Sequence, residues 1–80
     1  MPQYFFHLRD HGTLYEDREG TDLPDEKAAR EEALLTAREL LRVSNTSVRD
    51  WLGRSYEVAD QDARFVVAVP FADAMDIVVP

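Results

Sequence analysis

The chain has 80 residues, a net charge of −7 and no cysteine, which limits it to one small domain and excludes disulfide bonds, thiolate zinc sites and cysteine nucleophiles. Small secreted domains usually depend on disulfide bonds, and no apolar run in the sequence is long enough for a signal peptide or a membrane helix. We therefore expect a cytoplasmic protein that does not bind membranes.

The acidic residues are concentrated in one part of the chain. Residues 16–32 hold eight acidic and three basic side chains. Phosphate binding requires clustered lysine and arginine, and the sequence has no such cluster, so we expect no direct binding of nucleic acid. An acidic surface is complementary to a basic protein partner. The same charge is also typical of a surface that only keeps a domain soluble.

The first strand is predicted at residues 3–9, where Tyr4, Phe5 and Phe6 follow one another. Side chains of a strand point alternately to its two faces. The face that we expect to form the core carries Tyr4, Phe6 and Leu8. The opposite face carries Phe5 and His7, and we expect this pair of rings to belong to a contact surface.

A hairpin is predicted to follow the first strand. Residues 10–12 form a three-residue loop in this prediction, because Gly12 suits the left-handed position that ends such a loop. Residues 13–16 return as the second strand, and the polar, turn-rich residues 17–22 end the hairpin.

The main helix is predicted to open at residues 23–26, because Pro24 suits a first helical turn and acidic residues there complement the helix dipole. It is expected to run for about 17 to 18 residues and to stop at residues 44–45. Its small alanine side chains let it lie close to a sheet. The buried stripe has the spacing of one helix face and consists of Ala29, Ala33, Leu34, Ala37, Leu40 and Leu41, broadened by Ala28, Leu35 and Val43.

A second, very short helix is predicted next. Residues 47–50 match a capping box, and Gly53 closes the helical turn that they begin. Trp51 lies on the apolar side of this turn, so we expect its ring to close one end of the core.

Two further strands are predicted at residues 54–59 and 64–69. The second of them is apolar on both faces, which favours a central position in the sheet. The tail at residues 71–80 is ambiguous, because 72–75 suit a helical turn while 77–79 suit an edge strand or an ordered tail.

These elements predict one α+β domain over residues 1–80. The predicted elements follow one another along the chain in the order ββα(α)ββ. The four strands form one antiparallel sheet, and one long helix packs on one face of it. Residues 71–80 are a tail or an edge segment in this prediction.

The sequence contains no pattern that favours catalysis or cofactor binding. His7 and His11 are four residues apart in a strand and turn, where they do not share a face, so we expect no metal site. No spacing singles out an acid–base pair, a serine nucleophile elbow or a phosphate-binding glycine loop. We therefore expect no enzymatic activity and no cofactor.

The sheet face away from the main helix is the predicted interface. Exposed apolar patches on small domains usually mark a contact with another protein, and self-association lets a small domain bury more surface. We expect a protein-interaction module that forms a homo-oligomer, most simply a dimer, or binds a protein partner. As an alternative, residues 71–79 fold over this face. The predicted interface residues are Phe5, His7, Tyr15 and Val66, with Ala68 beside them.

Several short motifs are spread over the chain: the opening Pro2-Gln3-Tyr4-Phe5-Phe6-His7-Leu8, then Asp17, Gly20, Leu23-Pro24-Asp25, Ala28-Ala29 and Ala33, and finally Glu57-Val58-x-Asp60 and Val69-Pro70-Phe71. In these motifs the chain resembles a family of short uncharacterised bacterial proteins grouped as a domain of unknown function. The resemblance covers nearly the whole chain and implies a stand-alone cytoplasmic protein, without site residues that can be carried over.

Similar sequences often have glycine where this chain has Ala63. This departure predicts strain at Ala63 if the turn requires a positive φ. A looser likeness, a hairpin followed by an alanine-rich helix, connects the chain to antitoxins of the HicB type. It implies an alternative function, in which the chain is an acidic regulatory partner that masks a basic protein.

Overall fold

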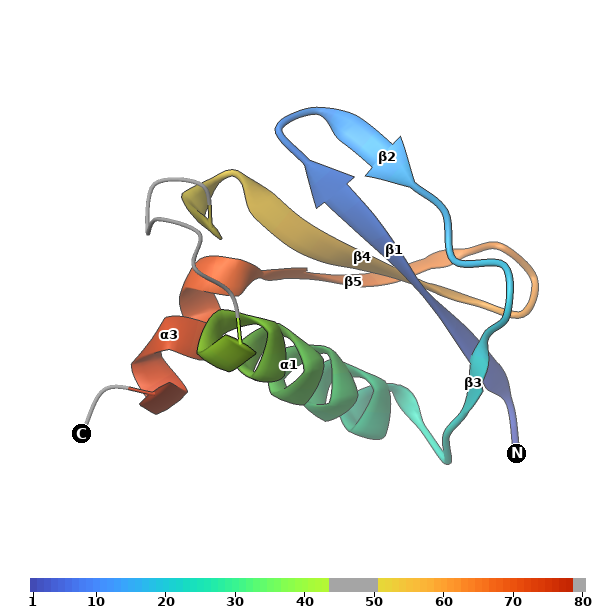
Figure 1. The fold of residues 1–80 in the computed structure, drawn as a ribbon. Helices are drawn as coiled ribbons and strands as arrows, with labels where there is room; N and C mark the ends of the chain where they lie inside the picture. Colours follow the sequence, from blue (N-terminus) through green and yellow to red (C-terminus); the bar gives the residue numbers. More distant parts are fainter. Residues whose placement is uncertain (44–50, 79–80) are drawn as a thin grey trace.

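The computed structural model describes residues 1–43 and 51–78. In these residues an antiparallel sheet packs against helices on one side (Figure 1). The predicted α+β class with one long helix is confirmed. The predicted helix stop at 44–45 and the capping box at 47–50 lie outside the described residues. The strands are β1 (Gln3–Asp10), β2 (Thr13–Tyr15), β3 (Thr21–Asp22), β4 (Arg54–Asp60) and β5 (Phe65–Pro70), and the helices are α1 (Glu26–Val43) and α3 (Phe71–Val78).

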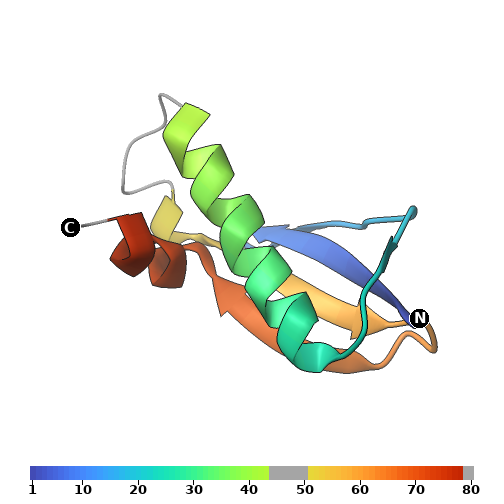
Figure 2. The same ribbon diagram turned by 90° about the horizontal axis from the view of Figure 1, so that it is seen from below.

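The sheet has five strands instead of the predicted four. Its order is β2–β1–β4–β5, and the short strand β3 pairs with the start of β1. The prediction of a central strand at residues 64–69 is wrong, because β5 lies at the edge of the sheet (Figure 2). One face of β5 buries Val69 in the core, whereas Phe65 on the other face is 67% exposed. A strand that is apolar on both faces therefore does not have to be central.

The hairpin between β1 and β2 has a two-residue loop, not the predicted three-residue loop. Asp10 pairs directly with Thr13, which leaves His11 and Gly12 as the loop. Their φ angles are 51° and 94°, and two positive φ angles are the signature of a type I′ turn. The N–H of His11 donates to the carbonyl oxygen of Gly53 at 2.8 Å, so the loop is attached to the residue before β4.

α1 begins at an aspartate cap. The N–H of Ala28 donates to the Asp25 carboxylate at 2.8 Å, and the N–H of Ala29 donates to the Asp25 carbonyl at 3.1 Å. These are the contacts of an N-cap residue. Pro24 therefore precedes the cap and does not lie in the first helical turn as predicted.

The face of α1 that meets the sheet is made of alanine. Ala29, Ala33 and Ala37 are fully buried, as predicted, and Leu34 and Leu41 pack at the margin of the core. Leu35 and Leu40 are exposed, so the predicted stripe is too broad. Because alanine fills little volume, the core is small, and its largest fully buried side chains are Phe71, Val58 and Val69.

The C-terminal segment forms α3, which packs against α1 (Figures 1 and 2). The prediction of an edge strand over residues 77–79 is wrong for 77 and 78, which are helical, and 79 lies outside the described residues. Phe71 stacks on Trp51 with ring centroids 5.1 Å apart. Trp51 is buried and belongs to the core, which confirms the apolar side predicted for its ring.

Candidate functional site: the outer sheet face

Both described helices lie on one side of the sheet, and the opposite side, which we call the outer sheet face, carries no described helix (Figures 1 and 2). In an antiparallel sheet, residues directly opposite one another project to the same side. Phe5 lies opposite Ala59, and His7 lies opposite Glu57. The predicted separation of β1 into a core row and an outer row is thus observed.

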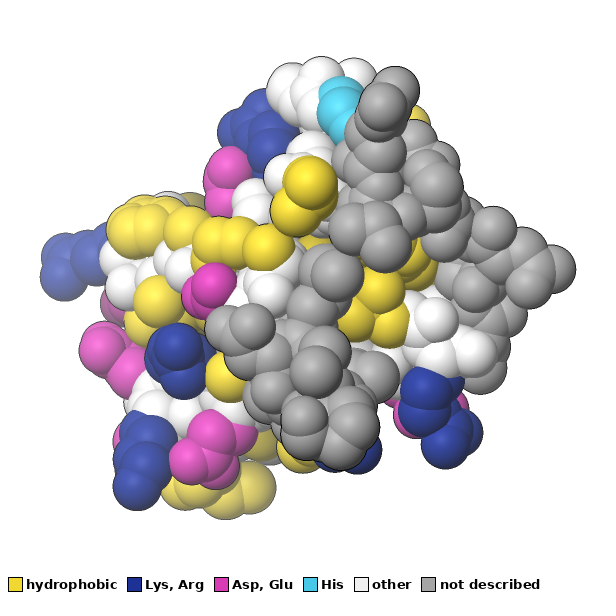
Figure 3. Space-filling model, turned by 90° about the vertical axis from the view of Figure 1, so that its left-hand side faces the viewer, with side chains coloured by type: hydrophobic (Ala, Val, Ile, Leu, Met, Phe, Trp, Pro, Cys, Tyr) yellow, Lys and Arg dark blue, Asp and Glu magenta, His cyan; other side chains and the backbone are white. Residues whose placement is uncertain are grey.

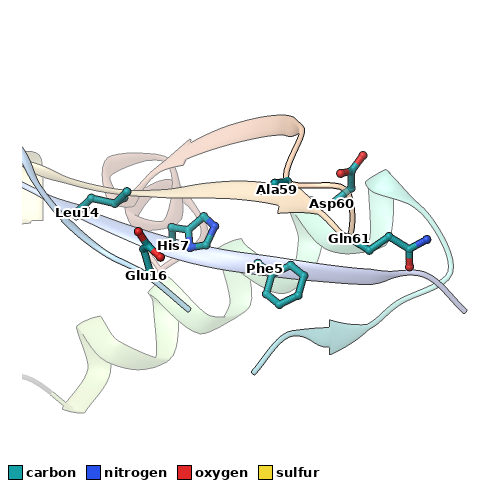
Figure 4. Close-up of a pocket in the computed structure, with 8 residues that line it drawn as sticks. Phe5, His7, Leu14, Glu16, Ala59, Asp60 and Gln61 are labelled. Atoms are coloured by element: carbon teal, nitrogen blue, oxygen red, sulfur yellow. The ribbon is translucent and has the colours of Figure 1, made fainter. Parts of the chain in front are cut away.

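The outer sheet face is hollowed between β1, β2 and the loop after β4 (Figure 4). The hollow has a volume of about 420 Å³. A smaller one of about 200 Å³ adjoins it, shares His7, Ala59 and Ala63 with it, and extends to Phe65. We call the larger one the outer hollow; it is lined by Phe5, His7, Leu14, Glu16, Ala59, Asp60, Gln61 and Ala63.

Two of the four predicted interface residues are not on this face. Tyr15 lies opposite Leu8, which is on the helix side, because the two-residue loop shifts the register of β2 by comparison with the predicted loop. Leu14 takes the outer position instead. A register that differs by one residue moves a side chain to the other face, and the sequence pattern of a three-residue strand does not determine that register.

Val66 also lies on the helix side, where it packs against the core together with Val67. The pairing of β4 with β5 shifts between Val58 and Ala59, so that Val67 and Phe65 pair with consecutive residues of β4 and Val66 is the extra residue of a bulge. Phe65 therefore occupies the outer position opposite Ala59. Ala68 is on the outer face opposite Glu57, as predicted.

The ring of His7 is held in place by the segment between β2 and β3. Its Nδ1 accepts a hydrogen bond from the N–H of Asp17 at 3.0 Å, so the proton of the neutral ring is on Nε2. The ring also lies within 10° of parallel to that of Phe5, with centroids 6.4 Å apart. His7 is therefore a fixed side chain of the sheet face.

The Asp17 carboxylate takes the place of a neighbouring strand along the middle of β1. It accepts hydrogen bonds from the N–H groups of Phe6 at 3.1 Å, Glu19 at 3.0 Å and Gly20 at 3.4 Å. Partial burial of the carboxylate acts to raise its pKa, but the backbone donors outweigh burial, so the pKa of Asp17 is lowered. Without this side chain, the N–H of Phe6 would lack that partner.

An ion pair lies beside the hollow on the same face. The Arg9 guanidinium binds the Glu57 carboxylate through Nε at 2.9 Å and Nη2 at 3.2 Å, and its Nη1 donates to the Gly12 carbonyl at 3.0 Å. The hydrogen bonds from Arg9 lower the pKa of Glu57. The charges of this pair cancel, so the pair adds no net charge to the outer sheet face.

The turn from β4 to β5 contains the strain that the family resemblance suggested. Ala63 has a φ of 64°, in the left-handed region. The N–H of Ala63 donates to the Asp60 carbonyl at 3.0 Å, and the N–H of Asp60 donates to the Arg64 carbonyl at 2.9 Å. This is a type I turn followed by a left-handed residue, a position in which glycine is usual.

A second concavity lies on the helix side, at the end of the molecule where α1 and α3 meet. It has a volume of about 450 Å³ and contains Arg54, whose guanidinium lies over the Trp51 ring at 5.1 Å and next to Asp10 at 3.3 Å. Hydrophobic and charged side chains both reach the surface at this end (Figure 3). The concavity is lined by Leu8, Asp10, Tyr15, Leu40, Trp51, Arg54 and Phe71.

Neither concavity brings together a set of metal ligands. In residues 1–43 and 51–78 no three histidine, cysteine, aspartate or glutamate side chains are placed to hold a metal ion. None of the helices in the described part of the chain has the length and apolar character needed to cross a membrane. What the outer hollow offers chemically is an apolar floor, one oriented imidazole and the exposed carboxylate of Glu16. Asp60 pairs with Tyr4, so its side chain projects to the helix side.

Comparisons with curated proteins and with solved structures gave no match. A family model matches residues 3–72, from the start of β1 to the first turn of α3. The match includes every strand of the sheet and the residues that line the outer hollow. The chain therefore belongs to the family described as Domain of unknown function (DUF6894).

Proposed function

We propose that the chain is a small, non-enzymatic protein-interaction module that docks another protein on its outer sheet face. The observation that carries this proposal is the gathering of apolar side chains on the side of the sheet that no described helix covers. Phe65 is 67% exposed and Leu14 is 37% exposed on this face. Exposed apolar side chains around a hollow favour contact with a partner. The apolar residues concerned are Phe5, Leu14, Ala59, Ala63 and Phe65.

The edges of the sheet are less suited to docking than its outer face. At one edge β2 and β3 have three and two residues. At the other edge β5 contains the bulge at Val66 and ends at Pro70, which has no N–H to donate. Short edge strands, bulges and proline are the features by which proteins oppose strand addition. These features support docking on the face of the sheet.

Site-specific photocrosslinking tests the proposal directly. The photoreactive residue p-benzoylphenylalanine is introduced at Phe65 or Leu14, and in a control variant at Leu35, which is 55% exposed on α1. Irradiation of cells of the native host should give a discrete crosslinked product from positions 65 and 14 and none from position 35. The proposal is wrong if the outer positions give no product, or if Leu35 gives the same one.

Self-association is the simplest form of this function, and the small core supports it. Three alanines form the buried face of α1, so the folded monomer buries few large side chains. A small domain can recover stability by burying surface against a second copy. Sedimentation velocity over a wide concentration range should then show a dimer for the wild-type chain and a monomer for Phe65→Glu. A wild-type chain that stays monomeric throughout would exclude this form but leave docking of a different protein possible.

A further inference from the structure

Phe65 projects from the outer sheet face as an isolated aromatic ring. It lies opposite Ala59 of β4 and is 67% exposed. Ala63 lines the smaller hollow together with Phe65, and Ala68 follows on the same face of β5. Because the side chains of these three neighbours end at a methyl group, the ring of Phe65 stands above the surface around it.

The outer hollow lies beside this ring on the same face. The smaller hollow connects the two, because it shares His7, Ala59 and Ala63 with the outer hollow and reaches Phe65. An enclosed cavity of about 150 Å³ can hold benzene, so an open depression of about 420 Å³ has room for a phenyl ring. One face therefore carries both a projecting ring and a depression that can receive such a ring.

The outer sheet face carries little charge although the chain is acidic. The net charge of the chain is −7, but Arg9 and Glu57 on this face form an ion pair and cancel. Glu16, which follows β2, and Asp22 of β3 add acidic side chains only at the margin of the face. The cores of protein interfaces are depleted in charge and enriched in aromatic residues. The charge distribution thus allows two copies of this face to meet.

One two-fold axis brings both rings and both depressions together. An interface with two-fold symmetry uses the same surface of both copies. An axis that lies in the face, midway between Phe65 and the outer hollow, exchanges these two positions. Phe65 is on β5 and the hollow is over β1, two strands away, so this axis runs along the strands. The two sheets are then aligned as in a β-sandwich, and the acidic margins of the two copies lie on opposite sides of the dimer.

We propose that the partner on the outer sheet face is a second copy of this chain, in a two-fold dimer in which Phe65 of each copy enters the outer hollow of the other. This inference rests on the proposed function and names the partner and the contact. Four strands of about 24 Å at a spacing of about 4.8 Å give the face an area of roughly 500 Å². Two copies would bury about 1,000 Å² in total, the lower limit for a specific interface. We therefore expect a dimer that dissociates at micromolar concentrations.

Sedimentation equilibrium of the purified full chain measures this dimer. The wild type should show an equilibrium between monomer and dimer, and Phe65→Ala should raise the dissociation constant at least tenfold. The expected effect is large because an aromatic ring in a pocket contributes much of the binding energy of an interface and the dimer contains this contact twice. Tyr15→Ala is the matched control, because Tyr15 is a 57% exposed aromatic residue on the helix side. It should leave the dissociation constant unchanged, and circular dichroism checks that both variants are folded.

Photocrosslinking of the purified chain tests where the ring lies in the dimer. p-Benzoylphenylalanine at position 65 keeps an aromatic side chain there, and a mixture of ¹⁵N-labelled and unlabelled chains identifies products that join two copies. Trypsin releases most of β1 in peptide 1–9, β2 in peptide 10–18 and β5 in peptide 65–80. Products between copies should join 65–80 to 1–9 or 10–18. Products that join 65–80 only to a second 65–80 would overturn the proposed contact.

The outcomes separate this inference from the proposed function. A wild-type chain that is monomeric at every concentration overturns the dimer, and a crosslink from position 65 to a different protein in cells would then still support docking on this face. A dimer that Phe65→Ala leaves intact, or that Tyr15→Ala weakens equally, also overturns the inference. If the purified chain is monomeric and position 65 gives no product in cells, both the inference and the proposed function are wrong.

Discussion

The carboxylate of Asp17 accepts the backbone N–H of Phe6 at 3.1 Å, across eleven residues of sequence. The N–H of Asp17 in turn donates to the imidazole of His7 at 3.0 Å. Through these two contacts Asp17 provides an acceptor for the Phe6 N–H in the middle of β1 and orients the His7 ring that lines the outer hollow. The edge of the sheet between β2 and β3 is completed by a side chain in place of a strand.

Replacing Asp17 by asparagine should destabilise the fold by about 1 to 3 kcal/mol at neutral pH, because the amide has one accepting oxygen where the carboxylate uses two, and its NH2 group would face a backbone N–H. The pKa of Asp17 in the folded chain lies below its ordinary value of 3.8. A carboxyl group with a lowered pKa adds stability above the unfolded pKa, and that stability is lost as the pH falls through the folded value. The difference between wild type and Asp17→Asn should therefore shrink in acid.

Urea unfolding at neutral pH and at a pH below 3.8 would measure this change. Glu31→Gln, an exposed substitution on α1, serves as the control and should have almost no effect at either pH. If Asp17→Asn lowers the free energy of unfolding by the same amount at both pH values, the charge of Asp17 does not stabilise the fold.

Removing the cap of α1 should have a smaller effect. Asp25→Ala leaves the N–H of Ala28 without the carboxylate that it now contacts at 2.8 Å, and we expect a loss of about 0.5 to 2 kcal/mol. Asp25→Asn keeps a side-chain oxygen at the same place and should retain most of the stability. Thermal unfolding of both variants measures the contrast, and equal losses for the two would contradict a capping role.

Gly53→Ala should destabilise the contact between the β1–β2 hairpin and β4. A methyl group at this position would overlap the ring of His11. Because this ring is exposed and can turn away at the expense of its contact with Asp10, we expect a loss of about 1 kcal/mol, the low end of the cost of overpacking. His11→Asn keeps a residue that tolerates positive φ and removes the ring. The cost of Gly53→Ala should therefore be smaller in the His11→Asn background, and a double-mutant cycle measures the difference. Independent, additive effects would exclude contact with His11 as the cause.

Ala63→Gly should raise the melting temperature. The left-handed conformation costs an alanine about 1 to 2 kcal/mol, and glycine adds about 0.4 to 1 kcal/mol of entropy to the unfolded chain. The net gain of about 0.5 kcal/mol corresponds to roughly 2 to 4 °C in a domain of this size. The same change at Ala68, inside β5, should lower the melting temperature. An unchanged or lower value for Ala63→Gly would contradict strain in this turn.

Local periodicity in the sequence was sufficient to identify the features that depend on one element alone. The alternation along β1 separates the core side chains Tyr4, Phe6 and Leu8 from Phe5 and His7, because a strand has a period of two. The spacing of Ala29, Ala33 and Ala37 identifies the buried side of α1, because a helix repeats every 3.6 residues. Neither inference requires knowledge of the neighbouring strands.

The tertiary structure alone decided the features that depend on how strands pair. Tyr15 and Val66 lie on the helix side because a two-residue loop and a bulge set the registers of β2 and β5. The position of β5 at the edge and the contact between Asp17 and Phe6 also join residues that are distant in sequence. The sequence by itself determined that an outer face exists and that Phe5 and His7 lie on it. Strand pairing added Leu14, Ala59 and Phe65, because a change of one residue in register exchanges the two faces of a strand.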